Sequence, residues 1–185
     1  NLSAARQWVS RLKADGGTEM AGALAFALAG REAPGTLRQV IFITDGAVGN
    51  EDALFRLIAE RLGSTRLFTV GIGPAPNGHF MAKAAQFGRG TFTHVGDTRE
   101  VGGKMTRLFA KIDAPVLRDV TVTWPDGAAV ETFPARVPDL YPGQPVVAAV
   151  PAPRLAGPAI VSGMRGNEPW SVALTPAAPA GPAGV

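Results

Sequence analysis

The chain of 185 residues contains no cysteine, which excludes a disulfide framework, a thiolate metal site and a thiol nucleophile. It also lacks an apolar run of the roughly 18 residues that a membrane-spanning helix needs. The longest candidate, Gly22 to Gly30, has about half that length. The sequence starts with Asn and shows no charged segment followed by an apolar one. We therefore expect a processed chain or an excised piece, with any export signal outside it.

Charge is distributed unevenly along the chain. The net charge of +3 divides into +5 for residues 1–112 and −2 for residues 113–185. The basic residues stand singly on predicted helix faces, as Lys104, Arg107 and Lys111 do, and no run of five basic residues occurs. This spacing predicts solvated helix surfaces and no nucleic-acid partner. An excess of Arg (14) over Lys (4), with abundant Ala, Gly and Pro, is typical of a GC-rich bacterial gene.

Proline usage divides the chain into unequal parts. Eleven of the 16 prolines fall in residues 134–185, and helical spacing of apolar residues ends near Ile112. We place a boundary at Asp113, so that residues 1–112 form one unit and residues 113–174 a β-rich one. Residues 175–185 are almost entirely Ala, Pro and Gly, which predicts a flexible tail.

Strand and helix patterns alternate through the first unit. Strands are expected at residues 39–44, 66–72 and 91–95. Helices are expected at about residues 2–12, 19–28, 51–62, 79–87 and 97–112. Asn50 should cap the helix that follows it, and Asp97 with Glu100 should form a capping box. The order predicts an α/β fold with a doubly wound, mostly parallel sheet, whose other strands we expect upstream of Asn1.

The second unit has short β-like segments between prolines and glycines. They occur at residues 118–124, 130–133, 145–150, 159–162 and 170–174. Asp126 and Gly127 should form a hairpin turn. These patterns predict a small antiparallel β module that packs on its neighbour, because so few residues build little core of their own. Trp124 and Trp170 are expected in that core.

Two residues are candidate ligands for a metal ion. Asp45 comes directly after the strand at 39–44, at the end of the sheet where ligands collect, and Thr18 follows Gly16 and Gly17. A carboxylate and a hydroxyl suit Mg²⁺, Mn²⁺ or Ca²⁺ and do not suit Zn²⁺. Each residue also has a structural alternative, since Asp45 could cap its own loop and Thr18 the next helix.

Three segments together resemble the second half of a von Willebrand factor A domain. They are Gly16–Leu24 (GGTEMAGAL), Val40–Gly46 (VIFITDG) and Phe68–Gly73 (FTVGIG). Lys111–Leu117 and Pro138–Pro145 are similar to the segment after this domain in inter-alpha-trypsin-inhibitor heavy chains and their bacterial relatives. The resemblance covers about residues 4–150 and implies an incomplete von Willebrand A fold, which is Rossmann-like.

The same resemblance implies a metal-ion-dependent adhesion site built from three loops. Thr18 matches the threonine of the second loop, and Asp45 matches the aspartate of the third, which usually acts through water. The first loop, Asp-x-Ser-x-Ser, does not occur in the 185 residues. The resemblance therefore implies Mg²⁺ or Mn²⁺, or Ca²⁺, in an intact domain, and a weak or empty site in this chain alone.

We expect a non-enzymatic protein-binding or adhesion module whose partner supplies an Asp or Glu carboxylate to the metal. One alternative is a structural or assembly domain of a cell-envelope protein with a non-functional metal site. Another is a metal-dependent or phosphoacceptor enzyme that uses Asp45, although no second acid accompanies it. The resemblance implies a secreted, periplasmic, cell-surface or membrane-anchored protein. The strand at 39–44 would expose an apolar edge, which predicts a homodimer or a strand swap there.

Overall fold

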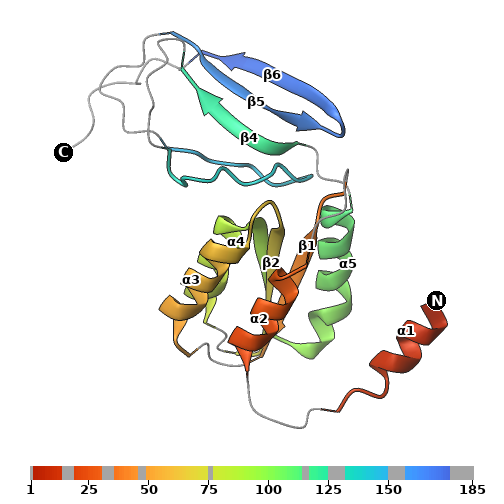
Figure 1. The fold of residues 1–185 in the computed structure, drawn as a ribbon. Helices are drawn as coiled ribbons and strands as arrows, with labels where there is room; N and C mark the ends of the chain where they lie inside the picture. Colours follow the sequence, from red (N-terminus) through yellow and green to blue (C-terminus); the bar gives the residue numbers. More distant parts are fainter. Residues whose placement is uncertain are drawn as a thin grey trace.

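The computed structural model describes residues 2–13, 19–30, 36–45, 49–74, 77–113, 117–124, 132–149 and 157–175. Its first part is built on a parallel sheet in the order β1-β2-β3 (Figure 1). The strands are β1 (Gln39–Thr44), β2 (Arg66–Ile72) and β3 (Arg89–Val95). Val40 lies opposite Leu67 and Thr44 lies opposite Gly71. All three strands occur where the runs of β-branched residues predicted them, and β3 begins two residues earlier than expected.

Helices cover both faces of this sheet, which confirms the doubly wound α/β class. One face carries α2 (Met20–Leu28), α3 (Glu51–Arg61) and α4 (Gly78–Phe87), and the other carries α5 (Val101–Ile112) (Figure 1). Side chains of β2 alternate between the two cores, because successive strand residues point to opposite faces. Leu67 packs with the three helices, while Phe68 and Val70 pack with Leu108 of α5.

The first helix, α1 (Leu2–Val9), stands apart from the sheet (Figure 1). None of its residues is buried, and Trp8 is 66% exposed. Its apolar spacing predicted the helix, although the helix ends at Val9 and not near Leu12. The described part of the chain offers no surface on which that apolar face packs. Within the described residues, no helix is both long and apolar enough to cross a membrane.

Of the two predicted helix caps, one is present and one is not. Asn50 does not cap α3: its φ is 53°, in the left-handed region, and its side chain makes no capping hydrogen bond. The prediction was wrong because an Asn can also occupy that backbone region without capping. A different asparagine, Asn77, caps the helix α4, and its side-chain oxygen accepts a hydrogen bond from the Phe80 N–H at 3.1 Å. The box predicted at Asp97 and Glu100 is present, although it opens a short 3₁₀ turn ahead of α5.

The second part is a separate antiparallel sheet in the order β4-β5-β6. Its strands are β4 (Arg118–Thr123), β5 (Ala159–Arg165) and β6 (Glu168–Leu174). The strands predicted at 130–133 and 145–150 are not strands where described, since only a single bridge joins Phe133 to Ala149. Prolines at 134 and 145 cannot donate to a ladder, which the apolar pattern did not register. The predicted turn at 126–127 lies outside the described residues.

An apolar cavity of about 590 Å³ lies under this sheet. Trp124 and Trp170 both line it, and the indole N–H of Trp124 is buried without a hydrogen-bond partner among the described residues. The two tryptophans are therefore directed inward as expected, and the described residues around them enclose a cavity.

A buried ion pair joins the two parts. Arg66, the first residue of β2, donates from Nε to Asp139 Oδ2 at 2.6 Å and from Nη2 to Oδ1 at 3.0 Å. The two side chains are 2% and 0% exposed. Asp119 of β4 accepts from Arg66 at 2.8 Å and from Arg89 at 2.9 Å. Two residues beyond Asp139, the Tyr141 ring meets the Phe68 ring edge-on at 5.7 Å. Residues 139–141 thus fasten the second part to the base of the parallel sheet.

Candidate functional site

The carboxyl ends of the three parallel strands meet at one edge of the sheet. Asp45 directly follows β1, and Gly73 directly follows β2. The Gly73 N–H donates to the Val95 carbonyl at the end of β3, at 2.8 Å. A Cβ atom on Gly73 would lie 4.0 Å from the Asp45 carbonyl, and the φ of Gly73 is +102°. The main chains of the strand ends are therefore in close contact, and the turn after β2 favours glycine because L side chains rarely adopt that φ.

Asp45 lies at this edge as predicted, and it is exposed. Its carboxylate makes no hydrogen bond or ion pair with another described residue. The loop that Asp45 could cap, residues 46–48, lies outside the described residues, so that alternative stays open. Thr18, the other predicted ligand, lies outside the described residues. The structure thus places one of the two candidate ligands and leaves the pairing of Thr18 with Asp45 as a prediction.

Other polar groups near this edge are engaged in holding loops. The Nδ2 of Asn77 donates to the Glu51 carboxylate, which ties the loop before α4 to the first turn of α3. Nε2 of His94 lies 2.9 Å from the Gly73 carbonyl, joining the end of β3 to the turn after β2. These bonds join the turns around Asp45 to one another. Asp45 itself is exposed at this edge.

The described residues do not by themselves fit a divalent cation. They contain no group of three or more His, Cys, Asp or Glu side chains that could hold a metal ion. Mg²⁺ demands near-ideal octahedral geometry and gives up water reluctantly, so a single carboxylate does not make a site. Asp45 can contribute one hard-oxygen ligand, directly or through water, and further ligands must come from elsewhere.

Asp139 is not identified from the sequence as one member of an ion pair. Asp139 and Arg66 are separated by 73 residues, so no local spacing connects them. Arg66 begins a strand of the first part and Asp139 lies in the β-rich second part, and no sequence pattern indicates that the two side chains form an ion pair. Their burial shows that Asp139 is structural: it holds the two parts of the chain together and lies away from the strand ends.

Comparison with known proteins places these features in a family. A family model described as von Willebrand factor type A domain matches residues 1–94. The mouse (Mus musculus) von Willebrand factor A domain-containing protein 5B1 is 32% identical over 147 residues, which covers 78% of this chain and 12% of that protein. Human (Homo sapiens) protein mono-ADP-ribosyltransferase PARP4 is 29% identical over 114 residues, covering 56% of this chain and 6% of the relative.

Among solved structures, the von Willebrand factor type A protein from Catenulispora acidiphila superposes with a TM-score of 0.60 at 21% identity. The match covers 94% of this chain and 49% of the other. At that identity it supports the fold alone. The chain spans only about an eighth of the 5B1 relative, so the activity of that whole protein does not transfer to it.

Proposed function

The chain belongs to the von Willebrand factor type A domain family, and from this premise we propose that it is a non-enzymatic adhesion module that binds another protein at the carboxyl ends of its strands. Domains of this family generally mediate protein interactions. The observation that supports this location is the exposed Asp45 carboxylate directly after β1, beside the glycine turn that ends β2. Open α/β sheets collect their ligands at this edge.

We further propose that an intact domain uses Mg²⁺ or Mn²⁺, or Ca²⁺, at this edge. Asp45 and Thr18 would supply two oxygen ligands, and a first loop of the Asp-x-Ser-x-Ser type, which is not in residues 1–185, would supply others. A carboxylate from an Asp or Glu of the partner protein would complete the coordination. Asp45 is suited to this role because its carboxylate is exposed and is not neutralised by a described cation.

The test is a calorimetric Mn²⁺ titration of the chain extended upstream by about half a domain. Saturable binding is expected in the wild type and should be lost in Asp45→Ala. Asp52→Ala is the matched control, because Asp52 is an exposed carboxylate in the first turn of α3 and lies outside the proposed site. Absence of Mn²⁺ binding in the extended wild type would refute the metal site.

The second candidate is a structural or assembly domain with a non-functional metal site. Two observations favour it: no metal-binding group occurs among the described residues, and β1 pairs only with β2 there. Ile43 on β1 is 51% exposed and Phe26 on α2 is 86% exposed. Under this proposal a second copy, or a swapped strand, covers the outer edge of β1. Light scattering should then show a dimer that Ile43→Lys dissociates, and a wild-type monomer would count against it.

Catalysis, nucleic-acid binding and location are proposals of the same kind. We propose that the chain is not an enzyme, that it binds no nucleic acid, and that it works in a secreted, periplasmic or cell-surface protein of bacterial origin, similar to inter-alpha-trypsin-inhibitor heavy chains. Phosphoryl or hydrolytic turnover that disappears in Asp45→Ala would overturn the first of these statements. Fractionation of cells that express the whole protein would test the last.

A further inference from the structure

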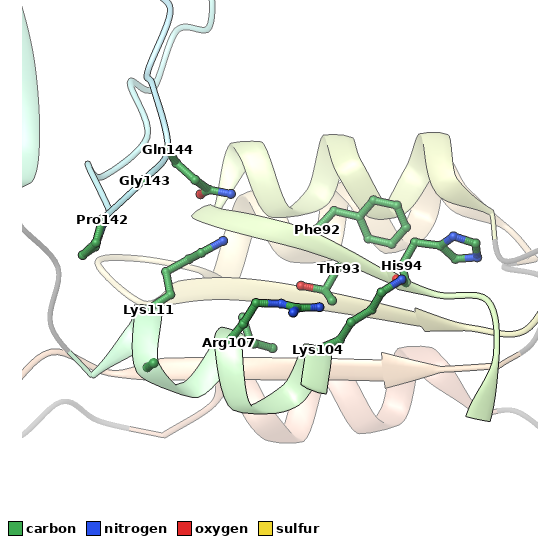
Figure 2. Close-up of a pocket in the computed structure, with 11 residues that line it drawn as sticks. Phe92, Thr93, His94, Lys104, Arg107, Lys111, Pro142, Gly143 and Gln144 are labelled. Carbon is green, nitrogen blue, oxygen red and sulfur yellow. The ribbon is translucent and has the colours of Figure 1, made fainter. Parts of the chain in front are cut away.

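A second concave surface lies away from Asp45, along the outer edge of β3. It is a cleft of about 540 Å³ between β3, α5 and the turn at residues 142–144 (Figure 2). Lys104, Arg107 and Lys111 follow one another along α5, and their side chains extend toward the strand (Figure 2). Gln144 stands at the end near Lys111. No carboxylate is among the residues that line the cleft.

The strand that forms this cleft has a free edge. β3 is the last strand in the order β1-β2-β3, and no described strand pairs with its outer side. The Val95 carbonyl accepts from Gly73, toward β2, whereas the His94 carbonyl accepts from Lys104 Nζ at 2.6 Å, away from the sheet. Peptide groups of successive strand residues point to opposite sides. Phe92 and His94 therefore present their N–H and C=O groups to the cleft.

The cations of the cleft are unequally neutralised. Lys104 is paired with Glu100 at 2.9 Å and bonded to the His94 carbonyl. Arg107 and Lys111 make no ion pair with a described carboxylate. Lys111 is partly buried beside the 142–144 turn, and this burial lowers the pKa of its ammonium group. The sequence predicts a solvated residue on the helix surface at this position. A desolvated cation without a counter-charge is unfavourable, and an anion in the cleft would remove that penalty.

We propose that the cleft binds an acidic, extended segment of a partner protein, which adds to β3 as a further strand and pairs its carboxylates with Arg107 and Lys111. The spacing supports a peptide strand. An α-helix rises about 6 Å over the four residues from Arg107 to Lys111. Alternate side chains of a strand are about 6.6 Å apart, so neighbouring same-side carboxylates match the two cations.

Lys104 makes the edge selective for acidic strands. Its ammonium occupies the His94 carbonyl, an acceptor that an added strand needs, and a charged side chain in this position discourages indiscriminate pairing. A neutral strand would displace Lys104 without offering it a new partner. An acidic strand would displace it and supply a carboxylate in exchange. The edge would then discriminate against a neutral strand, which costs Lys104 its hydrogen bond, as well as in favour of an acidic strand, which replaces that bond with an ion pair.

The probe is a fluorescein-labelled hexapeptide of alternating Glu and Val, with fluorescence anisotropy as the readout. Saturable binding is expected, and Arg107→Glu with Lys111→Glu should weaken it by about tenfold or more. Arg56→Glu with Arg61→Glu on α3 is the matched control, because it changes net charge equally on another exposed face. If circular dichroism shows that the double variant does not fold, the exposed single variant Arg107→Glu, expected to weaken binding several-fold, carries the test.

Three further measurements separate strand addition from simple anion binding. A peptide of the same charge, N-methylated at alternate residues, should bind at least tenfold more weakly, because it lacks the donors for the edge. A Gln-Val peptide should bind Lys104→Ala better than the wild type. EDTA should change nothing, which separates this surface from the proposed cation site. Equal binding of the N-methylated peptide, competition by inorganic phosphate alone, or no binding of the acidic peptide would each overturn the proposal.

Discussion

Removal of Arg66 should be among the most damaging single changes that the described structure allows. Arg66→Met keeps much of the apolar stem and leaves the Asp139 carboxylate, which is 0% exposed, without its bidentate partner. Loss of one member of a buried pair typically costs about 3–5 kcal/mol, because the remaining charge is left unpaired in the interior. Against a usual domain stability of about 5–15 kcal/mol, that is a large fraction.

Asp139→Asn should cost less than Arg66→Met. Arg66 would keep the Asp119 carboxylate at 2.8 Å and the Ser64 carbonyl at 2.7 Å, and the amide oxygen of Asn can still accept one hydrogen bond. Loss of a charge-assisted hydrogen bond is worth about 1.5–3 kcal/mol. The structure therefore predicts an asymmetric pair of variants, with the arginine change the more severe.

Urea denaturation at neutral pH, followed by tryptophan fluorescence, measures the free energy of unfolding for both variants and for the double variant that combines Arg66→Met with Asp139→Asn. The double variant should be less destabilised than the sum of the single changes, because it leaves no buried charge behind. A cost below about 1 kcal/mol for Arg66→Met, or a coupling energy below about 0.5 kcal/mol, would refute the buried pair.

Three other measurements test the fold. Burial, and then the charge of Asp139, raise the pKa of Tyr141, the single tyrosine of the chain, so its phenol should stay neutral near pH 10 in an ultraviolet absorbance titration. The free energy of unfolding should fall as the pH rises above about 10, because the unfolded chain loses that proton first. Titration of the folded protein with an ordinary tyrosine pKa would contradict this. Asn77→Ala should lower the free energy of unfolding by about 1 kcal/mol, because the helix cap is lost. Asn50→Gly should be neutral or stabilising in the same urea assay, because Asn50 has a positive φ and does not cap a helix. Equal effects of the two substitutions would show that the caps are misassigned. Gly90→Ala should lower the melting temperature, because its Cβ would lie 2.3 Å from a backbone carbonyl oxygen of β2. Gly102→Ala in α5 should raise the melting temperature, because its Cβ would meet nothing within 4 Å. A Gly90→Ala variant with an unchanged melting temperature would mean that the strands are less closely packed.

Local patterns were sufficient for most elements of the first part. The run of β-branched residues at 39–44 predicted β1 residue for residue, because a strand covered on both faces reads as continuous apolar sequence. Asp45 was placed correctly at the end of that strand for the same reason. The cap at Asn50 failed, since whether an Asn caps a helix or occupies a left-handed turn depends on the neighbouring chain and not on its own sequence.

The sequence by itself determined the strand and helix order, the family resemblance and the position of Asp45, all of which depend on neighbours within a few residues. Only the tertiary structure decided which charges are buried together and which edges stay free. Arg66 and Asp139 meet across 73 residues of chain. Lys111 becomes desolvated because residues 142–144 lie beside it. Spacing along a chain specifies local hydrogen bonds and periodic faces, whereas burial and pairing depend on which distant segments the sheet brings together.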